Sequence, residues 1–296
     1  MLLYGVSMVR NEADIIETFV RHNLRFLDRL LVVDHCSSDG TREILRALKQ
    51  EGLGLELDFD DVEGHRQAKT ITRLARRAFA EGASNVFALD ADELLKMPLR
   101  AKFERWIAIV PPQYCAAVEW QTYLPQSLDR DRRTPIEMQW RRAEEAHGLH
   151  KVVLTGAFAR ASTATVGPGN HTVLMEGPDQ DLETNPVQLA LCPLGIAAIA
   201  HLPVRSVDQL MRKVNTGWAA HLTANPSDTT LAVHWRDLFA DFAARGTPDL
   251  ERYRTIALNY GLPMARWQPS STVRVVSDPV PIVTQNRYDS LASPAR

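Results

Sequence analysis

The chain has 296 residues, of which 45% are hydrophobic and 24% are charged. This composition is typical of globular proteins and excludes a disordered, collagen-like or low-complexity chain. The 34 Lys and Arg residues nearly balance the 36 Asp and Glu residues, which gives a formal charge of −2. The chain therefore has no large positive net charge of the kind that would indicate nucleic acid or an anionic membrane as the partner.

Three isolated cysteines, Cys36, Cys115 and Cys192, provide no disulfide framework and lack the spacing of a zinc site. The first residues have no basic region of the kind that begins a signal peptide. The most apolar later stretch, Val187 to Ala200, is interrupted and too short to cross a bilayer. We therefore expect a soluble, cytoplasmic protein without a transmembrane segment.

The first hundred residues alternate short apolar runs with amphipathic helical patterns. Asn11 is expected to cap the first of the helices. This alternation predicts an α/β fold with a mostly parallel central sheet and helices on both of its faces. The predicted strands are Leu3–Val9, Arg29–Asp34, Leu55–Phe59 and Asn85–Asp90, and the predicted helices follow Asn11, begin after the loop that ends at Thr41, and cover His65–Ala80.

After Pro98 the pattern is less regular. Ser206 is expected to begin a helix, with Gln209 at the capping-box position, and Thr247 to cap a later one. The charged stretch Leu124–His150 is expected to be a loop. Its segment Arg130–Arg142 is expected to be a solvated charged surface, with ordering over the substrate or contact with an anionic headgroup as the alternatives. Further strands are predicted at Cys115–Tyr123, Lys151–Arg160 and Leu189–His201, and further helices near Leu231–Ala244 and Pro248–Tyr260.

Three polar clusters each come directly after a predicted strand: Arg10-Asn11-Glu12, Asp34 to Thr41, and Asp90 to Glu93. Ligands of parallel sheets bind beyond the carboxyl ends of the strands. The three clusters are therefore expected to meet at one edge of the sheet and to form the functional site.

Asp90 and Asp92 stand two residues apart at the end of a strand, where both carboxylates can reach one divalent ion. Hard oxygen ligands suit Mg²⁺ or Mn²⁺. His201 ends a later apolar run and precedes a capped helix, which makes its imidazole a reasonable further ligand. The alternatives are a solvated acidic turn for the two aspartates and a hydrogen-bonded core residue for His201.

The segments VSMVRNEADII, LLVVDHCSSDGT and DADE resemble the family-2-type glycosyltransferases, which have the nucleotide-sugar-binding GT-A fold. The resemblance is to the soluble bacterial branch with Arg-Asn-Glu after the first strand and Asp-Ala-Asp-Glu as the metal motif. The strong motifs lie within residues 1–96, and a thinner trace continues through Asn170-His171 and His201-x-Pro-x-Arg205-Ser206. The resemblance implies a GT-A-like, Rossmann-related catalytic domain over residues 1–205, with a helical C-terminal region over 206–296 packed on it.

The resemblance also implies roles for the matching positions. Asp92 and His201 would hold Mn²⁺ or Mg²⁺, and Arg205 would pair with the diphosphate of the donor. His150, Lys151 and His171 are further candidates for the donor or acceptor cleft. The residues expected to bind the nucleotide sugar are Val9, Arg10, Asn11, Glu12, Asp34, Asp39, Arg66, Gln67, Asp90, Ala91 and Arg205.

The implied reaction moves a sugar from a nucleoside-diphosphate sugar, with UDP favoured, to a hydroxyl of a saccharide or glycolipid acceptor in polysaccharide biosynthesis. An inverting enzyme needs a carboxylate base beside that hydroxyl, and Asp131 is chosen from several acids between Glu119 and Glu145. The chain lacks the downstream acidic pair and the Gln-x-x-Arg-Trp box of processive members, which argues against a membrane polymer synthase.

The sequence argues against two other enzyme classes and leaves one alternative of a different class open. A sugar nucleotidyltransferase would carry a Gly-rich basic loop where this chain has MVRNEAD. A phosphatase of the haloacid-dehalogenase type would carry its Asp-x-Asp on the first core strand. A nucleotide-sugar-binding module without turnover would share the motifs, and turnover of a sugar nucleotide separates it from an enzyme.

Overall fold

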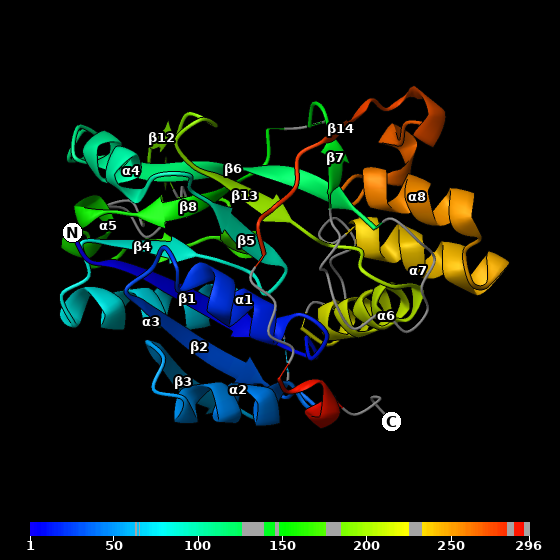
Figure 1. Cartoon of the computed structure of the whole chain (residues 1–296), viewed down its shortest axis with the longest axis horizontal. Coiled ribbons are helices and arrows are strands. Elements are labelled where there is room, and N and C mark those ends of the chain that lie inside the picture. Colours follow the sequence, from blue (N-terminus) through cyan, green and yellow to red (C-terminus); the bar gives the residue numbers. More distant parts are fainter. Residues whose placement is uncertain are drawn as a thin grey trace.

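The structure, a computed structural model, describes residues 1–62, 64, 66–125, 139–145, 148–175, 185–224, 233–282 and 287–292. Helices flank a curled central sheet, as Figure 1 shows. The helices are α1 Ile16–Asn23, α2 Thr41–Gln50, α3 Gln67–Ala80, α4 Arg100–Ile107, α5 Gly156–Arg160, α6 Val207–Ala224, α7 Val233–Arg245 and α8 Leu250–Leu258. The short 3₁₀ turns are η1 Pro168–Asn170, η2 Met264–Arg266, η3 Ser270–Thr272 and η4 Asp289–Leu291.

The strands of the central sheet have the order β14-β7-β6-β8-β4-β1-β2-β3. Off this path, β12 and β13 pair with β6, and β5 pairs with β13. Strands β3, β2, β1 and β4 pair in parallel, whereas β8, β7 and β14 extend the sheet in antiparallel fashion. The fold class expected from the sequence is confirmed. The strands of this sheet are β1 Leu3–Val9, β2 Arg29–His35, β3 Leu55–Asp60, β4 Asn85–Ala88, β5 Glu93–Lys96, β6 Cys115–Leu124, β7 Trp140–Arg142, β8 His150–Leu154, β12 Leu189–Leu191, β13 Ala198–His201 and β14 Val275–Ser277. A small second sheet contains β9 Thr165–Val166, β10 Val173–Met175 and β11 Asn185–Pro186.

Two apolar clusters cover the two faces of the central sheet. Helices α1, α2 and α4 contribute buried residues such as Phe19, Leu45 and Phe103 to one cluster. Helices α3 and α5 contribute residues such as Leu74 and Phe158 to the other. Because strands of this parallel core are buried on both faces, their sequences are continuous apolar runs rather than alternating ones. That is why the sequence identifies them well.

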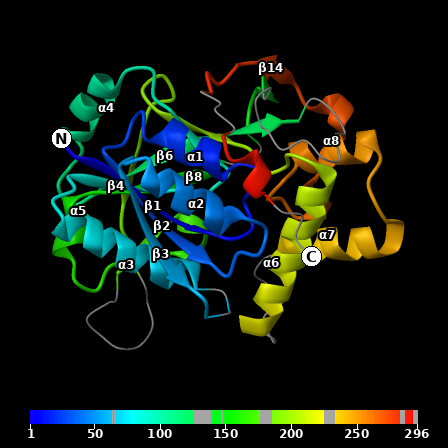
Figure 2. The ribbon, with the colours of Figure 1, turned by 60° about the horizontal axis from the view of Figure 1, so that its bottom comes forward.

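Helices α6, α7 and α8 form a third apolar cluster and lie together at one end of the molecule in both views (Figures 1 and 2). Ser206 Oγ accepts a 3.1 Å hydrogen bond from the amide of Gln209, which confirms the cap expected at the start of α6. The cap of α8 is Asp249, which accepts from Arg252, and the prediction of Thr247 is wrong. Among the described residues, no helix combines the length and the apolar character that spanning a bilayer requires.

The chain after α8 returns to the sheet. Strand β14 pairs with β7, a strand inside the stretch that was expected to be a loop. Farther on, the amides of Arg287 and Tyr288 donate to the Glu17 carboxylate at 3.3 and 3.2 Å. The carbonyl of Leu291 then lies so close to Gly40 that a Cβ placed there would be 2.1 Å from the oxygen. The tail therefore packs against the loop between β2 and α2.

Two predicted strands are interrupted in the structure. Lys151–Arg160 divides into β8 and α5, because Thr155 Oγ1 accepts a hydrogen bond from the amide of Ala157 and starts a helix. Leu189–His201 divides into β12 and β13 at a turn in which Pro193 accepts from the amide of Ile196 at 2.8 Å. The sequence does not predict strand β5, because this strand of four residues begins at Glu93, inside the acidic cluster.

Candidate active site

The three predicted polar clusters meet at the edge formed by the carboxyl ends of β1, β2 and β4. Parallel pairing in register places Val9 beside Asp34, and Val6 beside Ala88. The loops that follow these strands therefore emerge at the same edge of the sheet. Strand β13 is added by antiparallel pairing with β5, which sets His201 opposite Glu93.

Hydrogen bonds join the loop after β1 to the loop after β2. Asn11 has a φ of 55°, a left-handed conformation that Asn tolerates, and its Oδ1 accepts a 2.8 Å hydrogen bond from the amide of Ser38. The amide of Asn11 donates to Ser37 Oγ at 3.0 Å. Asp39 accepts from the amide of Ala13 at 3.1 Å. The prediction that Asn11 caps the first helix is wrong, because its side chain binds the neighbouring loop instead.

Asp90 follows β4 and is held by three side chains from three elements. Its Oδ1 accepts from Gln67 Nε2 at 2.8 Å and from Asn170 Nδ2 at 3.1 Å. Its Oδ2 accepts from Lys151 Nζ at 2.5 Å. Gln67 begins α3, Asn170 ends η1 and Lys151 lies on β8, so residues far apart in sequence fix one carboxylate.

Asp92 is buried beneath three cationic or imidazole groups. Its Oδ2 accepts a hydrogen bond from Lys213 Nζ and lies 3.8 Å from His201 Nε2 and 3.9 Å from the Arg205 guanidinium. Burial alone would raise the pKa of Asp92, but Lys213, His201 and Arg205 lower it below its usual value. Asp92 is therefore a permanent carboxylate.

Glu93 is fully buried next to Asp92, and hydrogen bonds occupy both of its oxygens. Oε1 accepts from Trp120 Nε1 at 2.7 Å and lies 3.2 Å from Lys151 Nζ, while Oε2 accepts from the amide of Asp90 at 2.9 Å. Burial raises the pKa of Glu93 to about 8, against the opposing effect of Lys151. Glu93 thus ties the acidic cluster to β6 and β8.

The end of α1 fixes the backbone of β5. Asn23 Nδ2 donates to the Glu93 carbonyl at 3.0 Å, and Asn23 Oδ1 accepts from the amide of Leu95 at 2.9 Å. His22 Nε2 lies 2.8 Å from the Leu95 carbonyl oxygen. These buried bonds satisfy polar groups on the edge of β5 that faces the helix, and they fasten the strand that begins with Glu93 to the end of α1.

Arg205 links the loop after β1 to the start of α6. Its guanidinium donates to Asp14 at 2.6 Å and to Glu12 at 2.5 Å, and its side chain is only 2% exposed. Burial alone would lower the pKa of Arg205, but Asp14 and Glu12 raise it. Burial also raises the pKa of Glu12 to about 7, although Arg205 acts in the opposite direction. The guanidinium of Arg205, which the sequence predicts to bind a diphosphate, thus donates to two acidic side chains of the protein itself.

The ring of Trp120 contacts two histidines of the site. Its ring stacks on His201 with centroids 4.0 Å apart, and it meets the edge of His171 at 5.1 Å. Burial lowers the pKa of His201 to about 3 and that of His171 to about 4. Both imidazoles are consequently neutral at physiological pH, which is the form that can coordinate a metal ion.

Asp92, Glu93 and His201 each offer a ligand atom, and these atoms lie within 4.8 Å of one another. Two carboxylates and an imidazole suit Mn²⁺ and also accept Mg²⁺. Asp92 and His201 are better placed than Glu93, whose oxygens already accept hydrogen bonds from Trp120, Lys151 and a backbone amide. The donor set therefore fits the divalent ion expected from the sequence.

Among the described residues, the remaining predicted site residues do not contribute ligand atoms to this cluster, and their burial and contacts are as follows. Asp34 is buried and accepts from Arg42 Nε at 2.8 Å, while Arg66 pairs with Asp60 at 3.7 Å. Val9 and Ala91 are buried. Arg10 carries a buried Nε that lacks a hydrogen-bond partner among the described residues. Asp131 lies outside the described residues.

Sequence reasoning missed Lys213, Trp120 and Asp14. Lys213 lies three residues after Leu210 and one before Val214, at the edge of the buried stripe of α6. A lysine next to an apolar stripe is a weak signal, since most such lysines are solvated. Trp120 sits within a predicted strand, where an aromatic residue is usually ascribed to the core.

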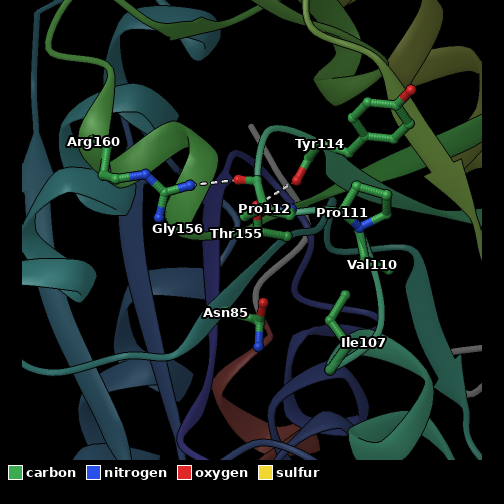
Figure 3. A pocket seen from close by; sticks show the side chains of 9 residues that line it. All are labelled: Asn85, Ile107, Val110, Pro111, Pro112, Tyr114, Thr155, Gly156 and Arg160. Atoms are coloured by element: carbon green, nitrogen blue, oxygen red, sulfur yellow. Dashed lines mark hydrogen bonds between the residues drawn. The ribbon is translucent and has the colours of Figure 1, made fainter.

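Figure 3 shows a pocket whose lining includes the first residue of β4. Asn85, which begins β4, lines it, whereas Asp90 follows the other end of the same strand. Its polar groups bind one another: Thr155 Oγ1 donates to the Tyr114 carbonyl at 2.6 Å, and Arg160 donates to the Pro112 carbonyl.

Comparisons with known proteins find distant structural likeness. No protein-family model matches the sequence, and no curated protein matches it. A mannosyltransferase from Pyrobaculum calidifontis, solved in complex with GDP-Man and Mn²⁺, is 16% identical with a TM-score of 0.40, over 83% of this chain and 76% of its own. A mannose-1-phosphate geranyltransferase from Thermus thermophilus is 13% identical with a TM-score of 0.31, over 54% and 52%. A 4-diphosphocytidyl-2C-methyl-D-erythritol synthase from Anaerococcus prevotii is 12% identical with a TM-score of 0.27, over 44% and 59%.

Proposed function

We propose that this chain is a metal-dependent glycosyltransferase that uses a nucleoside-diphosphate sugar, with a UDP-sugar favoured, and a saccharide or glycolipid acceptor. The observation that carries the proposal is the meeting of Asp92 and His201 at the carboxyl edge of the parallel strands. The loops bearing Asn11, Asp39 and Asp90 emerge at that same edge. The resemblance of these loops to a nucleotide-sugar-binding motif set supports the proposal.

Each residue has a proposed role that follows from its position in the site. Asp92 and His201 would hold Mn²⁺ or Mg²⁺, with the neutral imidazole and the permanent carboxylate both ready to coordinate. The bound ion supplies charge stabilisation to the departing nucleoside diphosphate. Asp90, fixed by Gln67, Asn170 and Lys151, is partly exposed and can accept hydrogen bonds from the ribose or the sugar. The buried ammonium of Lys151 would add positive potential to the site where the donor binds.

The acceptor side of the reaction is proposed from chemistry alone. An inverting transfer needs a carboxylate that takes the proton of the acceptor hydroxyl as it attacks the anomeric carbon. Asp131 remains our choice for that base. Glu145 is a described carboxylate near His201: it accepts from the amide and hydroxyl of Thr122, which pairs with His201 in the sheet.

The test is calorimetric binding of UDP, GDP, dTDP and CMP with and without Mn²⁺. We expect one nucleoside diphosphate to bind in a Mn²⁺-dependent manner, and Asp92→Asn to weaken that binding by about tenfold or more, as removal of a metal ligand does. Asp208→Asn makes the same chemical change at an exposed position of α6 and should leave binding unchanged. If no nucleotide binds the wild type, the proposal is wrong.

Turnover then distinguishes the transferase from the other candidates. Release of the nucleoside diphosphate from a nucleotide sugar, dependent on a saccharide acceptor, is the expected result. Formation of pyrophosphate from a nucleoside triphosphate and a sugar phosphate would instead identify a sugar nucleotidyltransferase. Tight binding without either reaction would identify a binding module.

A further inference from the structure

Lys213 extends from α6 to the carboxylate of the candidate metal site. Its Nζ donates to Asp92 Oδ2, the same oxygen that lies 3.8 Å from His201 Nε2. An ion that joined Asp92 to His201 through these two atoms would approach that oxygen to about 2.1 Å. The ammonium group and the ion would therefore compete for the same oxygen.

The other two buried cations of the site have several partners each. Arg205 is shared between Glu12 and Asp14. Lys151 is shared between Asp90 and Glu93 and also donates to a backbone carbonyl at 2.7 Å. Neither can leave without breaking its contacts with two acidic side chains, which makes them fixed parts of the structure.

Lys213 is held less firmly than either of them. In the part of the chain that the structure describes, Asp92 is its single carboxylate within 4.0 Å. Its side chain is 21% exposed, compared with 1% for Lys151 and 2% for Arg205. The ammonium also lies 5.4 Å from the centre of the Tyr260 ring, on which it can rest after leaving the carboxylate. A lysine can make this movement by rotating its flexible stem while the helix stays in place.

We propose that Lys213 is an exchangeable cation of the donor site: it neutralises Asp92 while no divalent ion is bound, and it turns to the donor's diphosphate when the ion takes Asp92. This inference rests on the proposed function, because it assigns a role to the metal and to the nucleotide. Without Lys213 or an ion, Asp92 would be a buried carboxylate with a weaker set of partners, and such a charge is costly. A lysine ammonium is also a common ligand for phosphate.

Two binding experiments test the exchange separately. Free Mn²⁺ is measured by electron paramagnetic resonance in the presence of the protein alone, with no nucleotide. We expect Lys213→Met to bind Mn²⁺ about tenfold more tightly than the wild type, a typical coupling between two groups that compete for one site. In the presence of saturating Mn²⁺, the same variant should bind UDP about tenfold more weakly, because one phosphate contact is lost.

Arg212→Met is the matched control, because Arg212 is the neighbouring residue on α6, is exposed, and loses the same charge. It should leave both affinities unchanged. Lys213→Gln retains a hydrogen-bond donor to Asp92 without the charge, and it should shift Mn²⁺ binding in the same direction as Lys213→Met. Circular dichroism and thermal unfolding verify that each variant is folded.

The outcomes separate this inference from the proposed function. If Mn²⁺ binding is unchanged or weaker in both Lys213 variants, the ammonium does not compete with the ion and the exchange is refuted. If Mn²⁺ binding tightens but UDP binding does not weaken, the turn toward the diphosphate is refuted. If the wild type binds no nucleotide at all while Mn²⁺ binding tightens in the variants, the competition at Asp92 stands and the transferase proposal fails.

Discussion

Replacing His22 by Gln tests how the contact between α1 and β5 contributes to the pH dependence of the free energy of unfolding. His22 is buried, and its Nε2 lies 2.8 Å from the Leu95 carbonyl oxygen, while its Nδ1 lacks a hydrogen-bond partner among the described residues. Burial lowers the pKa of His22 from its usual 6.5 to about 4, in spite of that backbone contact. The folded protein therefore excludes a proton that the unfolded chain takes up below pH 6.5.

The sign and size of the effect follow from this difference. Stability falls as the pH decreases from 6.5 to 4, because protons bind preferentially to the unfolded chain, and it levels off below 4. A difference of about 2.5 between the two pKa values corresponds to about 3 kcal/mol in total. Of this contribution to the free energy of unfolding, about 2 kcal/mol is lost between pH 7 and pH 4.5.

The assay is urea-induced unfolding of the wild type and His22→Gln at pH 7 and pH 4.5. Gln can donate to the same carbonyl but cannot be protonated, so the variant should lose about 2 kcal/mol less between the two pH values. His171 and His201, whose pKa values burial also lowers, are present in both proteins and cancel in the comparison. Equal losses in the two proteins would refute the reasoning, because His22 would then titrate normally in the folded state.

Two further substitutions test other contacts by urea-induced unfolding. Gly40→Ala should cost about 2 kcal/mol, because Gly40 has a φ of +94° and the new Cβ would collide with the carbonyl of Leu291. Gly52→Ala, at a φ of +76° with open space around it, should cost only about 1 kcal/mol, and equal losses would argue against the tail contact. Arg205→Lys should cost about 3 kcal/mol, because a lysine cannot satisfy both carboxylate partners of the guanidinium. Arg212→Lys, exposed on the same helix, should change stability by less than about 0.5 kcal/mol, and a similar loss at both positions would contradict the buried pairing.

The parallel half of the fold could be predicted from sequence because each strand there is a continuous apolar run followed by turn chemistry. The same logic placed the segments around Asn11, Asp39 and Asp90 at one edge, since parallel strands share the direction in which they end. Asp92 and His201 were predicted to meet, and the structure places Nε2 and Oδ2 3.8 Å apart. The roles of these residues in binding remain predictions.

The contacts that could not be predicted depend on elements distant in sequence. Lys213 reaches Asp92 only because α6 follows β13, and β13 pairs with the unpredicted strand β5. Trp120 reaches Glu93 through the pairing of β6 with β8 and β13. Local patterns carry no information on such pairings, since loop closure over tens of residues leaves many registers open.

The interlocked loops after β1 and β2 restrict how this sequence can diverge. Asn11, Ser37, Ser38 and Asp39 satisfy hydrogen bonds across the two loops, so a change at one of them leaves a polar group on the opposite loop without its partner. Positions 26 and 27 residues apart in the chain are thus expected to covary as one unit. A homologue with a different sequence in one loop is expected to carry matching changes in the other, because a mismatched pair of loops would lower the stability of the fold.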